Sequence, residues 1–233
     1  METVGVCMNQ EQRKAWNENH KRLTDMIAKP AEHQEAVELF LSQHAWLYAG
    51  GMDGDGHPTM EDELVQDIKE ETLRRYPVEM PDTRNSIVWH LWHIARIEDM
   101  TMNVLIHGGD QLFHNWQAKM NVTAVHSGNE MREEEAAAFS ATVDPDALFS
   151  YRLAVGRRTR EIMRSLQPGQ FKTKVDPARI RRLLEQGAVK DEARWLLDYW
   201  GGKTFAGLVL MPATRHPFVH LNRCLRIKEK YQK

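Results

Sequence analysis

The sequence predicts a single all-α domain built on a four-helix bundle with additional short helices. Apolar residues recur at helical spacing along most of the 233 residues. Strict alternation of apolar and polar residues, which is typical of half-buried strands, is hard to find. No linker rich in Pro, Gly or Ser divides the chain. A chain of this length buries about 70% of its unfolded surface, so it needs no disulfides to form a core.

The first part of the chain is divided by prolines and glycines. Residues 9–28 predict a polar helix with a thin apolar stripe, and Pro30 ends it. Proline suits a first helical turn, so the next helix is expected over residues 31–48. The glycine-rich stretch 50–58 predicts a loop, and residues 59–75 predict a further helix. We therefore expect residues 1–29 to form an N-terminal helical extension and residues 30–233 to form the main domain.

The rest of the chain continues this pattern. After Pro77 and Pro81, a helix is expected to start at Asp82 or Thr83, and the segment that follows is the most apolar long one. The later segments predicted as helices are 85–106, 111–120, 131–140, 145–166 after Asp144, 177–186, 191–200 and 203–229, with a loop over 121–130. The longer ones are able to form the bundle.

Charge and cysteine content exclude several classes of protein. The 31 basic and 33 acidic residues give a net charge of −2, so we do not expect the charge of the whole chain to drive binding to nucleic acid or an anionic membrane. Two cysteines, Cys7 and Cys224, are too few for a disulfide framework or a thiolate zinc site. No secretory signal and no run of 18 apolar residues is visible. The expected location is cytoplasmic, with no membrane partner.

Two pairs of histidines carry the functional signal. His90 and His93 lie three residues apart on a largely apolar face of the helix 85–106. His216 and His220 lie four apart, a spacing by which one helix gives a metal two imidazole ligands. Pro217 lies between them, so either a helix starts near Thr214 or a longer helix bends there. A third imidazole from a neighbouring helix would complete a three-histidine site with an open position.

Other interpretations remain open at this level. The histidines of either pair are also explained as hydrogen-bonded core residues, and helical periodicity does not choose between His90 and His93 as a ligand. Cys224 is four residues beyond His220 and is either near the same pocket or a small buried side chain. Glu98 and Asp99 lie well round the helix from His93, so neither is an obvious general base. The sequence therefore identifies no catalytic residue.

Three separated segments together resemble the DinB-like family. They are VWHLWHIARIED at residues 88–99, NWQAKM at 115–120 and MPATRHPFVHLN at 211–222. The resemblance covers roughly residues 30–230. It implies a four-helix bundle that holds a divalent metal, most often zinc or nickel, through three histidines. Two prolines, Pro212 and Pro217, flank His216, the first histidine of the pair, and depart from the straight helix that is usual in the family.

The resemblance also implies which residues bind and what they do. His93 matches the ligand from the first motif, and His216 and His220 match the pair. His90 occupies a position that varies among relatives, so it is expected to line the pocket or to support a ligand. Members are often homodimers. Some are thiol S-transferases that use low-molecular-weight thiols and others are metal-dependent hydrolases, so a small-molecule substrate is expected.

Three functions from different classes follow from these observations. The first is a metal-dependent enzyme that activates water or a thiol. The second is a non-catalytic helical bundle that binds a metal or a ligand. The third is a structural bundle in which the histidines are packed and paired. The sequence names neither the metal, because an all-imidazole site suits several divalent ions, nor the substrate.

Overall fold

The computed structural model of the protein describes residues 10–50 and 58–232. The predicted loop over residues 50–58 therefore lies almost entirely outside the described residues, as do Cys7 and the start of the predicted N-terminal extension. Within the described ranges there is no strand, and the only β-type pairings are two isolated bridges. The all-α prediction is confirmed.

The described chain is a succession of α-helices joined by shorter 3₁₀ and π-helical segments. The α-helices are α1 (Gln10–Met26), α2 (His33–Ala45), α3 (Met60–Val65), α4 (Glu70–Arg74), α5 (Ile87–Glu98), α6 (Glu133–Thr142), α7 (Pro145–Ser165), α8 (Pro177–Glu185), α9 (Trp195–Gly201), α10 (Phe205–Leu210) and α11 (His216–Tyr231). The 3₁₀ segments are η1 (Pro30–Glu32), η4 (Leu112–Asn115), η5 (Gln170–Lys172) and η6 (Asp191–Ala193); the π-helical segments are η3 (Asp99–His107) and η7 (Met211–Arg215).

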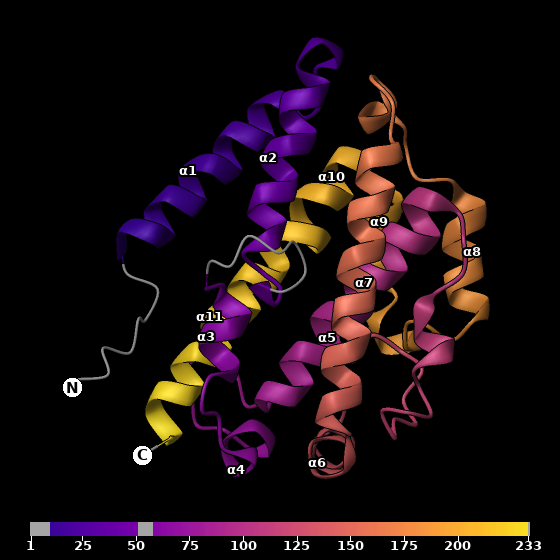
Figure 1. The fold of residues 1–233 in the computed structure, drawn as a ribbon. Helices are drawn as coiled ribbons and strands as arrows, with labels where there is room; N and C mark the ends of the chain where they lie inside the picture. The colour runs from indigo at the N-terminus through magenta and orange to yellow at the C-terminus, as the bar shows by residue number, and fades with distance from the viewer. Residues whose placement is uncertain (1–9, 51–57, 233) are drawn as a thin grey trace.

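Four long units form the bundle. They are α2, α5 with its continuation η3, α7, and the sequence α10–η7–α11. Helix α5 packs against α7 and α11, and α2 packs against α7 and η7, which closes the bundle. Figure 1 shows α7 running along the bundle, with α11 extending toward the C-terminus. The meeting of α5 and α11, which lie far apart in the sequence, is what positions the candidate site.

Helix α1 lies against α2 and completes the packing on one side (Figure 1). The indole of Trp16 stacks on the ring of Phe218 in α11, with centroids 3.8 Å apart. Leu23 and Ile27 are buried in the half of the core that also contains η3 and α10. The predicted apolar stripe of the first helix is therefore the face that this helix buries.

Several predicted helices are interrupted or shortened in the structure. The segment 191–200 is the 3₁₀ turn η6 followed by α9, and the segment 111–120 contains only the 3₁₀ turn η4. The segment 59–75 is two short helices, because Asp67 adopts a positive φ of 55° that ends helical geometry between α3 and α4. The segment 85–106 begins at Ile87, one residue after its cap Ser86 rather than at Asp82 or Thr83, and continues into the wider π-helix η3. The segment 203–229 consists of α10, the π-helical turn η7 and α11.

Candidate metal centre

Helix α5 presents its histidines from the most deeply buried part of the bundle. The side-chain oxygen of Ser86 accepts a hydrogen bond from the backbone N–H of Trp89, which caps the helix start. Every residue of α5 is buried, and the exposed fractions of His90 and His93 are 1% and 3%. Imidazoles in such surroundings require partners for their nitrogens. The structure gives each of them at least one.

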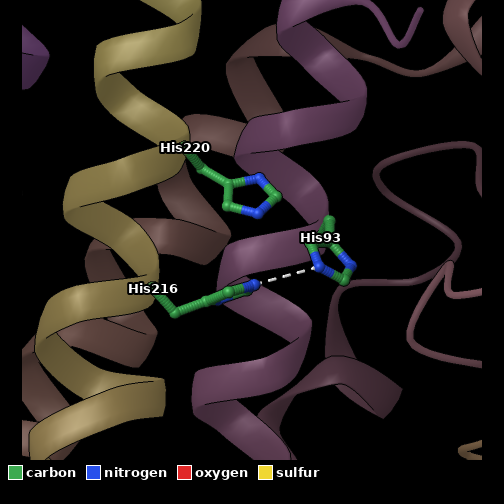
Figure 2. A group of neighbouring side chains, drawn as sticks. All are labelled: His93, His216 and His220. Atoms are coloured by element: carbon green, nitrogen blue, oxygen red, sulfur yellow. Dashed lines mark hydrogen bonds between the residues drawn. The ribbon is translucent and has the colours of Figure 1, made fainter. Parts of the chain in front are cut away.

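Helix α11 presents the second pair of histidines from its first turns. Proline has no backbone N–H and is tolerated only where that group lacks an intrahelical acceptor, as in a first turn. Pro217 stands there, directly after His216, the first residue of α11. The structure combines the two predicted arrangements around Pro217: α11 starts at His216, two residues later than Thr214, and the π-helical segment η7 leads into it without a break. One helical turn separates His216 from His220, so both face α5 (Figure 2).

The two helices bring three imidazoles together. His93, His216 and His220 each offer one ring nitrogen, and these three atoms all lie within 4.8 Å of one another. Figure 2 shows the rings of His216 and His220 directed from α11 toward His93 on α5. The Nε2 atoms of His93 and His216 are 3.2 Å apart. His93 and His220 are buried, and His216 is partly exposed, which gives the cluster a side toward solvent.

The ring of His93 is held in one orientation and one tautomer. Its Nδ1–H donates a hydrogen bond to the backbone carbonyl of Ser127, at 2.6 Å. This assigns the proton to Nδ1 and leaves the lone pair of Nε2 facing His216. The indole of Trp89 stacks on the same ring, with centroids 4.7 Å apart and planes at 12°. Such contacts to the outer nitrogen of an imidazole are how proteins orient metal-binding histidines.

The loop that supplies the Ser127 carbonyl is fixed by a glycine. Gly128 has a φ of +89°, a conformation that side-chain-bearing residues rarely adopt. A Cβ at this position would lie 2.6 Å from Cζ3 of Trp92 and 3.3 Å from Cζ2 of Trp89. The backbone of the loop therefore lies directly on the two tryptophans of α5. This close approach sets the distance from Ser127 to His93.

His90 lies beside the cluster and contacts only one of its members. Its Nδ1 is 2.9 Å from Nδ1 of His220, and its Nε2 is 3.0 Å from the hydroxyl of Thr83. It is not one of the three residues whose nitrogens converge. The sequence did not choose between His90 and His93, and the structure brings His93 into the group of three.

Burial keeps all four histidines uncharged. It lowers the pKa of His93 to about 4, although the bond to Ser127 partly opposes the shift. It lowers the pKa of His90 to about 3, with the neighbouring His93 adding to the effect. It also lowers the pKa values of His216 and His220 well below 6.5, and the other histidines of the cluster contribute. Neutral imidazole is the form that binds metals, so the cluster is ready to bind at neutral pH.

The two acidic residues at the junction of α5 and η3 serve the core. Glu98 accepts hydrogen bonds from His44 and from the hydroxyl of Tyr48, at 2.9 and 2.8 Å. Asp99 accepts a bond from the hydroxyl of Tyr151, at 2.8 Å. Both carboxylates are fully buried. Neither faces the three histidines as a general base would, in agreement with their positions round the helix.

Two charged residues at the edge of the cluster were not selected from the sequence. Nη1 of Arg223 lies 3.4 Å from Nε2 of His220, and Nε of Arg223 donates to Asp82 at 2.9 Å. Arg226 donates to the same oxygen of Asp82, at 2.7 Å. Arg223 follows His220 by three residues, so helical spacing was a signal that could have found it. Asp82 carries no such signal, because the fold alone brings it to α11.

Cys224 is placed away from solvent. Its side chain is fully buried within the core cluster around α5 and α11, and burial raises the pKa of its thiol to about 12. A thiol with such a pKa is neutral and unreactive at pH 7. The residue therefore has the environment of a small buried hydrophobe.

The residues present fit a divalent metal. Three neutral imidazoles from two helices converge, which is the donor set of zinc, nickel and related ions. Nδ1 of His216 is buried and has no hydrogen-bond partner. Because His93 carries its ring proton on Nδ1, the contact between the two Nε2 atoms requires His216 to donate from Nε2, which leaves the buried Nδ1 lone pair of His216 without a donor. With a metal bound, the Nε2 lone pairs of both histidines would be directed to the ion. These three histidines could therefore hold a metal ion.

Comparison with known families identifies the chain. A family model of the DinB superfamily matches residues 55–198, and a search of curated proteins finds no match. The matched segment includes α5 and ends before α11, so the meeting of His93 with His216 and His220 is seen only in the structure. Among the described residues, no helix has the length and apolar character needed to cross a membrane.

Proposed function

The chain belongs to the DinB superfamily, and from this premise and the histidine cluster we propose that it is a divalent-metal-dependent enzyme. His93, His216 and His220 would hold the metal, with zinc or nickel as the ions that suit three imidazoles best. The convergence of their three nitrogens within 4.8 Å is the observation that carries the proposal. When bound, such an ion acts as a Lewis acid that lowers the pKa of a coordinated water or thiol.

A low-molecular-weight thiol is the nucleophile that this site favours over water. Hydrolysis of an amide needs a group that delivers a proton to the leaving amine. Glu98 and Asp99 are bound to other partners, and among the described residues the cluster of converging ligand atoms contains no carboxylate. Transfer of a thiolate sulfur to an electrophile needs no such group. An ordinary thiol also ionises near pH 8.5, so it requires far less activation than water.

The charge around the site supports an anionic ligand. One carboxylate, Asp82, is shared by the guanidinium groups of Arg223 and Arg226, which leaves a local excess of one positive charge. The three imidazoles are neutral, and the metal would add two more positive charges. A thiolate, or a thiol that carries a carboxylate, is attracted to such a site. We therefore place S-transfer first and metal-dependent hydrolysis second.

Metal content is the first measurement. The protein would be purified without a chelating tag and analysed by mass spectrometry, together with His220→Ala and the matched control His114→Ala, an exposed histidine outside the cluster. About one divalent metal per chain in the wild type and control, and a marked loss in His220→Ala, supports the site. Absence of metal from all three proteins, even after zinc or nickel is added, would refute the metal site and indicate that the histidines are packed core residues.

Turnover is tested with the metal-loaded protein. Cysteine and glutathione serve as thiols and 1-chloro-2,4-dinitrobenzene as the electrophile, with a p-nitrophenyl ester as the hydrolysis substrate. Thiol consumption in equal amount to product, lost in His220→Ala, supports S-transfer. Ester cleavage without thiol supports hydrolysis. Bound metal with no turnover of either substrate class would support the alternative function, a non-catalytic protein that binds a metal or a ligand.

A further inference from the structure

His90 and His220 form a direct imidazole–imidazole contact beside the candidate metal centre. Their Nδ1 atoms are 2.9 Å apart and their rings meet edge to face, with centroids 4.9 Å apart. Both rings are buried, at 1% and 7% exposed. A hydrogen bond between two neutral imidazoles requires that one of the two nitrogens carries the proton. The assignment of that proton determines what His220 offers to a metal.

The surroundings of the pair assign the proton to His220. Arg223 has no acceptor, so the contact of its Nη1 with Nε2 of His220, at 3.4 Å, is favourable only if that Nε2 is a lone pair. A neutral His220 must then carry its proton on Nδ1 and donate it to His90. His90 in turn donates from Nε2–H to the hydroxyl oxygen of Thr83, at 3.0 Å. Every bond in this chain has one donor and one acceptor.

We propose that His90 is a positioning residue that accepts the Nδ1–H of His220 and thereby fixes the Nε2 lone pair of His220 toward the metal. This inference rests on the proposed metal site and adds the device that orients one of its ligands. The hydroxyl of Thr83 is itself held in place, because it also accepts the backbone N–H of Asn85 at 3.1 Å. His90 is thus fixed at both nitrogens before it contacts His220.

The proposal gives the three ligands unequal support. The Nδ1–H of His93 is held by the Ser127 carbonyl and that of His220 by His90, so both ligands expose Nε2 in the same tautomer. His216 has no corresponding partner at Nδ1. Outer partners of metal-binding histidines contribute substantially to metal affinity. Loss of His90 should therefore weaken metal binding although His90 itself binds no metal.

The affinity test compares two substitutions of His90. His90→Phe keeps a buried ring but removes the acceptor, and it is expected to weaken Zn²⁺ binding about 10- to 100-fold in a chelator competition assay. His90→Asn restores an acceptor, since its Oδ1 takes the approximate position of the imidazole Nδ1, and it is expected to bind Zn²⁺ within about threefold of the wild type. Circular dichroism and the thermal midpoint establish that both variants are folded. Equal Zn²⁺ affinity in the Phe variant and the wild type would overturn the proposal, as would equal weakening in both variants.

The tautomer test needs no substitution at His90. In ¹⁵N-labelled metal-free wild type, long-range proton–nitrogen correlation spectra report which ring nitrogen of each histidine is protonated. The assignment of His220 comes from the signal missing in His220→Ala. The expected result is a protonated Nδ1 and an unprotonated Nε2. Protonation of Nε2 in the wild type would overturn the proposal even if both substitutions weakened binding.

The proposed metal site and the proposed role of His90 can be refuted by different results. A wild type that binds no Zn²⁺ under any condition would refute the proposed metal site, and the role of His90 would fall with it. A wild type that binds Zn²⁺ with an affinity independent of position 90 would refute only the role of His90.

Discussion

Lowering the pH from 7.5 to 5.5 is expected to destabilise the metal-free protein by about 5 kcal/mol. The cause is a set of four histidines that burial holds neutral, namely His90, His93, His216 and His220. In the unfolded chain each of them binds a proton near pH 6.5. In the folded state the pKa of His93 is lowered to about 4 and that of His90 to about 3, so the unfolded state binds more protons in this range.

The sign and the size follow from proton linkage. Above pH 6.5 both states are neutral and the stability is complete; as the pH falls, each histidine lowers the free energy of unfolding by about 1.4 kcal/mol per pH unit until its folded pKa is reached. Between pH 7.5 and 5.5 this amounts to about one unit per histidine. Carboxylates titrate mostly below this range, so they contribute little. Burial also lowers the pKa values of His20 and His126, which adds to the loss in the same direction.

Urea unfolding at pH 7.5, 6.5 and 5.5, after dialysis against a chelator, measures this loss. The variant His90→Phe should lose about 1.4 kcal/mol less than the wild type over the range, because one titrating group is gone. The exposed His114→Phe, which lies outside the cluster, is the matched control. The reasoning would be refuted by a total change below about 1 kcal/mol in the wild type, because the histidines would then be protonated equally in both states.

Three further predictions concern the supporting structure and the metal. Gly128→Ala places a Cβ 2.6 Å from Trp92 at a backbone φ of +89°. It should therefore lower the free energy of unfolding in urea by more than about 1 kcal/mol and weaken Zn²⁺ binding. An unchanged stability and an unchanged Zn²⁺ affinity would contradict the close approach of this loop to Trp92. Glu61→Gln removes the counter-charge of the buried Arg152 guanidinium, which Glu61 binds at 2.6 Å, and should lower the free energy of unfolding by about 3–5 kcal/mol. The exposed Glu133→Gln should lower it by less than about 1 kcal/mol. Equal losses would be inconsistent with the difference in burial. If the free metal concentration is 100 times the Kd, chelation should lower the free energy of unfolding by about 2.7 kcal/mol and lower Tm by about 5–10 °C, and added Zn²⁺ should reverse both changes. A Tm that responds to neither treatment argues against a metal bound to the folded state.

The helices were predictable because their signals are local. Helical spacing of apolar residues, the cap at Asp144 and the prolines at the first turns of α7 and α8 act within a few residues of the chain. The main errors were continuous helices over 59–75 and 203–229. The first is broken by the positive φ of Asp67, and the second is widened at η7 just before Pro217. The periodicity of apolar residues predicts neither interruption, since both depend on how the neighbouring elements pack.

The candidate ligands were predictable in part. The i, i+4 pair His216 and His220 is visible in the sequence, and the resemblance pointed to His93 as the third member. Only the tertiary structure decides whether these three side chains meet, because His216 follows His93 by 123 positions in the chain. The structure brings their nitrogens within 4.8 Å. It also shows that His90 lies outside this group and that, of the three, His90 bonds to His220, which helical spacing did not decide.

The sequence by itself determined the all-α class, the family and the residue types that the candidate site uses, because apolar spacing, caps and short motifs each lie within one segment of the chain. Only the tertiary structure decided which nitrogens face one another. It places the Ser127 carbonyl on His93, the ring of His90 on His220 and the pair Asp82 and Arg223 at the edge of the cluster. These contacts join segments that the chain separates widely. They depend on distances of about 3 Å, which the packing of α5 against α11 and against the loop at Gly128 sets and no local pattern encodes.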